Sequence, residues 1–134
     1  MAVRVHETQP ALLDEQTLRM PQREVVSQLV DTLGSRLVAV IGNVKQTRTV
    51  REWMENREPQ GHRLQVLRFA LQVARAIKTR YDDVTAQSWF QGMNHHLLDQ
   101  APALVLKHIT DESIAEVITG EQQVMEALRN FLER

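Results

Sequence analysis

The chain has 134 residues, a formal net charge of −1 and no cysteine, so it is long enough for one well-packed domain or two small subdomains. The absence of cysteine excludes disulfides and thiolate metal sites. The longest uninterrupted apolar run, residues 37–41, is far shorter than the roughly 20 residues of a membrane span, and the N-terminal residues lack an apolar signal-peptide core. We therefore expect a cytoplasmic protein with no membrane partner.

The small net charge conceals a segregation of charge along the chain. Residues 1–35 carry 3 Lys/Arg against 5 Asp/Glu, residues 36–80 carry 10 against 3, and residues 81–134 carry 3 against 9. A basic segment is typical of a nucleic-acid-binding surface, whereas an acidic segment would repel the same phosphates. The simplest interpretation is that two parts of the chain bind two different partners.

The first third of the chain predicts an arm followed by a helix. Residues 1–20 mix charge and Gln with few large apolar groups, so we expect a flexible N-terminal arm with at most a short helix around residues 12–18. After Pro21, which suits a first helical turn, apolar residues recur at helical spacing until Gly34 ends the helix. No stretch alternates well enough to predict a strand.

The next stretch has the outline of a helix-turn-helix motif. Ser35 is expected to cap a short helix over residues 36–41, and Gly42 is expected to supply the positive φ of the turn. Thr47 is expected to cap a second helix that runs to about Asn56, and both helices carry an apolar stripe. Two packed helices with a turn between them would result.

The remaining side chains of the second helix face water or a partner. Arginine grips phosphate and reads guanine edges well, so double-stranded DNA is the expected partner. The expected base-reading residues are Gln46, Thr47, Arg48 and Arg51, and the expected phosphate contacts are Lys45 and Arg57. The alternative is an ordinary helical hairpin whose basic face is only solvated.

A long helix over residues 62–81 is expected to join the two halves of the chain. Asp82 and Asp83 break its pattern and can cap the following helix, which Gly92 ends. Residues 93–100 are predicted to form a loop. The helices expected in this half cover residues 84–91, 101–108, 110–118 and 121–133.

The last two of these helices are predicted to be separate, because Thr110 can cap the first of them and Gly120 can stop it. The expected fold is therefore all-α, with a helix-turn-helix bundle joined by a long helix to a small helical domain. The expected divisions are a flexible arm (1–20), a DNA-binding domain (21–81) and a protein-binding domain (82–134).

Residue patterns of catalysis and of cofactor or metal binding are not found. His95 and His96 are adjacent, so on a helix they would point about 100° apart, and no HExxH pattern accompanies them. The chain has no glycine-rich phosphate-binding loop and no nucleophile elbow. An acid/base pair formed by Asp82 and Asp83 is less plausible than helix capping. We expect no enzyme activity, no catalytic residues, no metal and no cofactor.

One motif in the acidic half resembles a known family. Residues 89–102 follow the order W-F-x-G-x-N-x-x-L-x-x-x-x-P, formed by Trp89, Phe90, Gly92, Asn94, Leu97 and Pro102. This order resembles the toxin-binding domain of Xre/MbcA/ParS-type antitoxins, in which an Xre-like helix-turn-helix precedes that domain. The resemblance covers about residues 22–134. It implies that the chain neutralises a cognate toxin, often a RES-domain enzyme that consumes NAD, and represses its own operon.

The resemblance also implies where the toxin would bind. In this family the C-terminal end of the antitoxin lies over the active site of the toxin. Met125, Leu132 and Arg134 are expected to flank the buried stripe of the last helix, where they could enter a partner's cleft. Trp89 and Asn94 complete the expected partner-binding set because they belong to the motif.

Two other classes of function stay open. The chain could be a solitary helix-turn-helix regulator or phage-type repressor without a toxin, and a toxin gene next to its own would argue against this. It could also be a helical adaptor whose helix-turn-helix is only a scaffold, and salt-dependent DNA binding would argue against that. For either DNA-binding class we expect a homodimer on two half-sites of its operator, because one motif covers a single half-site.

Overall fold

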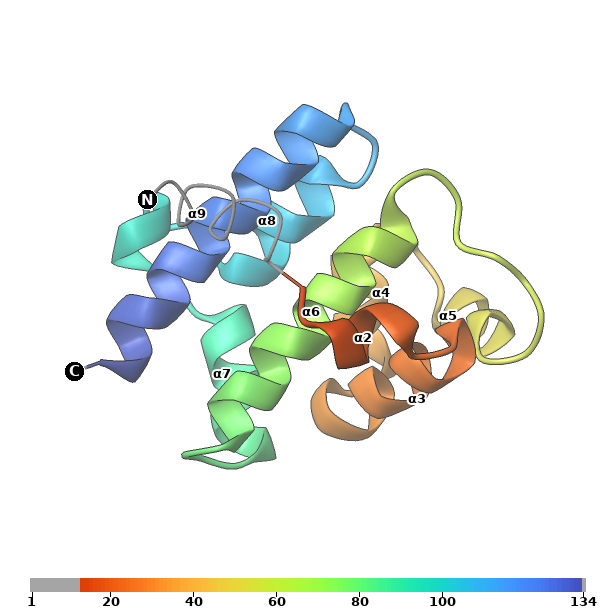
Figure 1. The fold of residues 1–134 in the computed structure, drawn as a ribbon, viewed down its shortest axis with the longest axis horizontal. Coiled ribbons are helices and arrows are strands. Elements are labelled where there is room, and N and C mark those ends of the chain that lie inside the picture. Colours follow the sequence, from red (N-terminus) through yellow and green to blue (C-terminus); the bar gives the residue numbers. More distant parts are fainter. Residues whose placement is uncertain (1–12, 134) are drawn as a thin grey trace.

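The described residues, 13–133, are helical, with no strand among them, as the computed structural model in Figure 1 shows. The expected all-α fold is confirmed. The elements are α2 (Glu15–Arg19), α3 (Gln22–Leu33), α4 (Ser35–Ile41), α5 (Thr47–Trp53), α6 (Arg63–Lys78), α7 (Asp83–Gln91), the 3₁₀ helix η1 (His95–Leu97), α8 (Pro102–Ile109) and α9 (Ile114–Leu132).

Helix α6 lies in the middle of the molecule, with α2 to α5 on one side and α7 to α9 on the other (Figure 1). It buries side chains around most of its circumference, because it packs on both groups. Helices also pack directly across the predicted boundary after residue 81, since α3 contacts α7 and α4 contacts α8. The two halves therefore share one hydrophobic core. Whether each half folds alone stays a prediction.

The described part of the expected arm is packed rather than free. Thr17 is fully buried, and the guanidinium of Arg68 on α6 donates to the carbonyl oxygens of Thr17 and Met20, at 2.8 and 2.6 Å. These bonds hold the short helix α2 against α6. The short helix expected around residues 12–18 is therefore present as α2, packed against α6, and residues 1–12 of the expected arm lie outside the described residues.

The start points of α4 and α5 differ by one residue from those expected. Ser35 and Thr47 were predicted as caps, but each is the first residue of its helix. Gly34 takes the cap position before α4 with a φ of +88°, a conformation that glycine adopts without strain. Gln46 takes the cap position before α5, and its side chain makes no capping bond.

The predicted break at Gly120 does not occur, and α9 is continuous. A Cβ added at Gly120 would lie 2.8 Å from Cγ2 of Ile109, so this glycine permits close packing between α8 and α9. Thr110 follows the end of α8, and Ser113 caps α9 instead by accepting from the backbone N–H of Glu116. Gly120 was predicted to end a helix, but in the structure it lies within α9 at the contact with α8.

Candidate functional site

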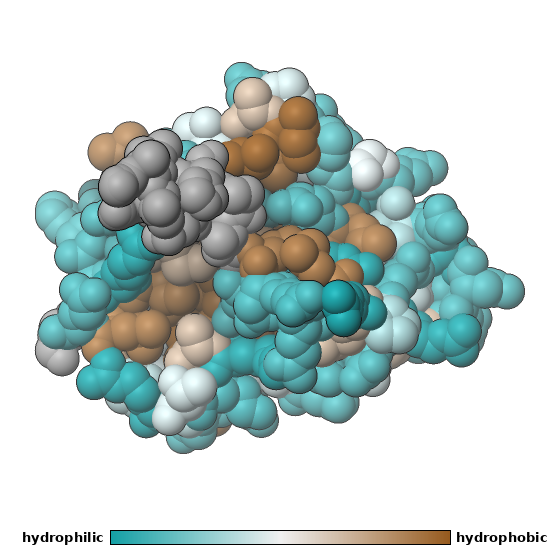
Figure 2. Space-filling model, viewed as in Figure 1, coloured by the Kyte–Doolittle hydropathy of each residue, from teal (hydrophilic) through white to brown (hydrophobic). Residues whose placement is uncertain are grey.

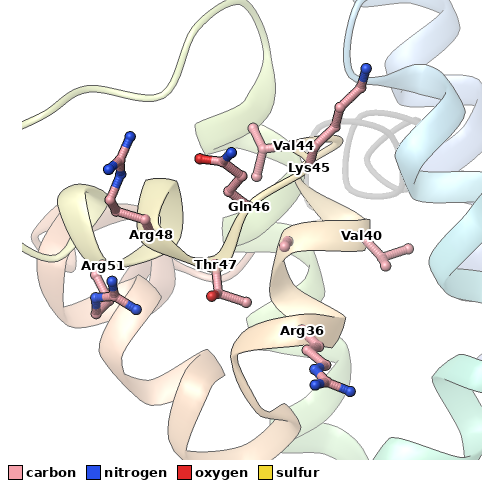
Figure 3. Close-up of a pocket in the computed structure, with 9 residues that line it drawn as sticks. Arg36, Val40, Val44, Lys45, Gln46, Thr47, Arg48 and Arg51 are labelled. Carbon is pink, nitrogen blue, oxygen red and sulfur yellow. The ribbon is translucent and has the colours of Figure 1, made fainter.

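Helix α4, the following turn and α5 surround an open hollow of about 600 Å³ (Figure 3). Five of the six predicted DNA-binding residues line it: Lys45, Gln46, Thr47, Arg48 and Arg51. Arg36 from the start of α4 also lines it, together with Ala39, Val40 and Val44. The structure thus brings together side chains from both helices of the predicted motif.

The turn between α4 and α5 is closed by backbone hydrogen bonds. The N–H of Asn43 donates to the carbonyl of Val40, and the N–H of Val44 donates to that of Ala39, both at 3.0 Å. This pattern is the Schellman ending of a helix, which needs one residue in the left-handed region. Asn43 is that residue, with a φ of +57°.

Gly42 therefore does not supply the positive φ that was predicted for it, because its φ is −81°. Its role is steric. A Cβ at Gly42 would lie 2.8 Å from Cη2 of Trp53, so the lack of a side chain lets the indole ring pack against the turn. The sequence analysis assigned the left-handed residue to Gly42, one position before Asn43, which adopts that conformation.

The hollow is rich in positive charge. Arg36, Lys45, Arg48 and Arg51 are exposed, and no acidic side chain lies among its lining residues. In the described part of the chain the nearest ion pair is a loose one, with 3.9 Å between Nε of Arg48 and a carboxylate oxygen of Glu52. Figure 2 shows that the surface over α5 and the loop after it is largely hydrophilic. The cations are thus available to an anionic ligand.

Arg57, the sixth predicted DNA-binding residue, lies outside this hollow. Its guanidinium pairs with Glu52, and its carbonyl accepts from the side-chain amide of Gln22 at 2.7 Å. The same amide donates to the carbonyl of Trp53 at 3.1 Å. The structure thus uses the backbone at Arg57 to tie the end of α5 to α3, and does not place its side chain with the other five.

Sequence reasoning missed Arg36, Val40 and Val44 as neighbours of the predicted contacts. Arg36 had a usable signal, because it is an exposed cation at the start of the helix that precedes the turn. Val40 and Val44 had none, since both look like ordinary core positions of a helical hairpin and are in fact half-buried.

A second hollow, of about 670 Å³, lies between α7, η1 and α9. Its lining residues are Thr85, Ser88, Trp89, Gly92, Met93, Asn94, His95, His96, Ala127, Asn130 and Phe131. It contains Trp89 and Asn94 of the expected partner-binding set. Met125 and Leu132 are instead half-buried against the core and do not line it, and Arg134 lies outside the described residues.

Asn94 shapes one wall of this second hollow. Its Oδ1 accepts from the N–H of His96 at 2.9 Å, and its carbonyl accepts from the N–H of Asp99 at 2.9 Å. Asn94 thus bonds the backbone of its own loop through both its side chain and its carbonyl. The loop so closed holds Leu98 in the left-handed region, with a φ of +56° and 92% of its surface exposed. Trp89 also lines this hollow, and its ring packs edge-on against that of Phe90.

Among the described residues, no group of three or more His, Cys, Asp or Glu side chains is arranged to hold a metal ion. No helix in the described range is both long and apolar enough to cross a membrane. No protein-family model matches the chain, and neither a curated protein nor a solved structure matches it. The resemblance to antitoxins stays a prediction that rests on the motif.

Proposed function

We propose that this chain is an antitoxin-like helix-turn-helix regulator that binds the operator of its own operon as a homodimer. The observation that carries the proposal is the open hollow between α4 and α5, which gathers five predicted DNA-binding residues and four exposed cations. Helix N-termini and arginines that project together into solvent are the usual means of contacting a DNA duplex.

In the proposed complex α5 enters the major groove. Gln46, Arg48 and Arg51 contact base edges, and Thr47 at the start of α5 lies beside them. Lys45 and Arg36 lie at the rim of the hollow and contact phosphates of the two flanking strands. Arg57 is left out of this set because its guanidinium is paired with Glu52.

The test replaces Arg48 with alanine and measures fluorescence anisotropy on two duplexes. One duplex is the fragment upstream of the chain's own coding sequence, and the other is a scrambled version of it. A base-reading arginine is worth about 1–3 kcal/mol, so we expect Arg48→Ala to weaken the upstream duplex by roughly tenfold and to leave the scrambled duplex nearly unchanged.

Two matched variants interpret this result. Lys45→Ala should weaken both duplexes alike and reduce the salt dependence of binding, because a phosphate contact carries no sequence information. Arg129 forms an exposed ion pair on α9, and Arg129→Ala should leave the affinity for both duplexes unchanged. Wild-type affinity of both Arg48→Ala and Arg51→Ala for the upstream duplex would refute the assignment of α5 as the recognition helix.

The second hollow supports a second proposed activity, the binding of a cognate toxin protein, for which a RES-domain NAD-consuming enzyme is the candidate. Two aromatic side chains, Trp89 and Phe131, line it with their rings 6.3 Å apart, and Met93, which also lines it, is 83% exposed. Aromatic and Met side chains are enriched at the centres of protein interfaces. The two alternatives differ from this proposal in their partners: a solitary regulator would bind DNA but no toxin, and a helical adaptor would bind a protein but no DNA.

We expect Met93→Ser to weaken capture of the neighbouring gene's product by about tenfold, because an exposed apolar side chain at an interface centre loses its buried contacts. The measurement is a pull-down titration with the purified product. Val84→Ser is the matched control, since Val84 is 66% exposed and does not line the hollow. Equal effects of the two variants would show that the partner binds a surface other than the second hollow.

A further inference from the structure

Arg63, the first residue of α6, contacts the turn between α4 and α5. Its Nε donates to the carbonyl of Gly42 at 2.7 Å, and its Nη2 donates to the carbonyl of Asn43 at 3.3 Å. Only 12% of its side chain is exposed. Both carbonyls belong to the Schellman turn that sets where α5 starts.

The same guanidinium also binds Asp111 in the loop between α8 and α9. Nη1 of Arg63 lies 2.9 Å from Oδ1 of Asp111, and Nη2 lies 3.4 Å from Oδ2. Asn43 donates to the same carboxylate from its side-chain amide, at 3.3 Å. Three segments that are distant in the sequence therefore meet at one side chain.

Only arginine can make this set of contacts. Its planar guanidinium carries five N–H donors in a fixed fork, whereas a lysine ammonium is a single point of charge and cannot span two carbonyls and a carboxylate. The partners of Arg63 compensate for the burial of its charge, because Asp111 supplies the opposite charge and the carbonyls accept from other N–H groups of the guanidinium.

We propose that Arg63 is a positioning residue that holds the turn between α4 and α5, and that Asp111 makes this position depend on the α8–α9 loop. The inference rests on the proposed DNA-binding function, because the orientation of α5 is what the clamp would set. The groups that the Arg63 guanidinium binds, on Gly42, Asn43, Gln60 and Asp111, do not belong to the lining residues of the hollow, so we expect it to act on DNA through the turn.

The test compares Arg63→Lys, Asp111→Asn and the double variant in the full chain. Arg75→Lys is the matched control, since Arg75 is on the same helix and its guanidinium bonds Gln16 instead. The first measurement is amide hydrogen exchange of residues 43 and 44. We expect about tenfold faster exchange in Arg63→Lys, no change in the amides of α9, and no change in Arg75→Lys.

The second measurement is the ratio of affinities for the upstream and scrambled duplexes. We expect Arg63→Lys to lower this ratio by about fivefold without changing the salt dependence, because phosphate contacts are untouched. Asp111→Asn should lower it less, and the double variant should be no worse than Arg63→Lys, since the two groups act as one unit.

The outcomes separate this inference from the proposed function. Unchanged exchange at residues 43 and 44 in Arg63→Lys overturns the clamp, whatever happens with DNA. Faster exchange with an unchanged affinity ratio overturns the positioning role. A wild-type chain that binds neither duplex refutes the DNA-binding function, and the exchange data then still decide whether Arg63 holds the turn. Asp111→Asn covers the case in which Arg63→Lys does not fold, because the Asp111 side chain is 60% exposed.

Discussion

Replacing Trp53 with alanine is expected to lower the free energy of unfolding by about 3–5 kcal/mol, because the change leaves a large cavity in the core. Trp53 is 1% exposed and is among the largest fully buried side chains. Its ring lies against Gly42, and its loss would free both the turn and the end of α5. Urea denaturation followed by circular dichroism measures the change. A loss below about 1 kcal/mol would contradict this account of the core.

Two variants show whether the contact with Gly42 contributes. Trp53→Phe should cost less than Trp53→Ala, because a phenyl ring fills part of the cavity. Gly42→Ala should destabilise the wild-type chain, since the added Cβ would lie 2.8 Å from Cη2 of Trp53. It should cost less in the Trp53→Phe background, where that atom is gone. Additive effects in the double variant would mean that the two sites do not interact.

Glu121 is expected to destabilise the wild-type chain increasingly as the pH rises from about 4.5 to about 7. Glu121 is fully buried in α9, with Oε1 accepting from the side-chain amide of Gln65 at 3.0 Å. In the described part of the chain Oε2 has no hydrogen-bond partner. Burial disfavours the ionised form and raises the pKa of Glu121 from 4.5 to about 7.

The sign follows from proton linkage. Between these two values the folded state holds a proton on Glu121 that the unfolded state has lost, so this carboxyl group does not lower the stability below pH 4.5 and lowers it progressively as the pH rises. The size is on the order of 3 kcal/mol, since each pKa unit is worth about 1.4 kcal/mol. Acidic groups elsewhere add their own opposite dependence, so the contribution of Glu121 must be isolated by substitution.

Glu121→Gln provides that isolation, because glutamine keeps the shape of the protonated carboxyl and cannot ionise. We expect the variant to gain stability over the wild type at pH 8 and to show no difference from it near pH 4. The measurement is the urea midpoint at several pH values. Glu126→Gln, on the exposed face of the same helix, is the matched control. A difference between Glu121→Gln and the wild type that is independent of pH would mean that folding does not raise the pKa of Glu121.

Capping was predictable where the signal is local. Asp82 was expected to cap α7, and its carboxylate does accept from the N–H of Thr85 at 2.9 Å. The side-chain and backbone bonds from Thr85 also hold the pKa of Asp82 below its ordinary value. The caps predicted at Ser35 and Thr47 were placed one residue too late in the chain: Gly34 also suits a cap position, and Gln46 occupies its cap position without a side-chain capping bond.

The all-helical fold could be predicted without the structure, because apolar spacing of three and four residues depends only on local chain geometry. The same spacing predicted six outward-facing DNA-binding residues, of which five line the open hollow between α4 and α5 and Arg57 does not. Tertiary structure alone decided the roles of Gly42 and Gly120, because each is explained by a side chain that lies against it, from Trp53 and from Ile109. It also decided the meeting of Arg63 with Asp111, which are 48 residues apart. Close contacts between distant segments depend on how the helices pack, and local sequence patterns do not predict that packing.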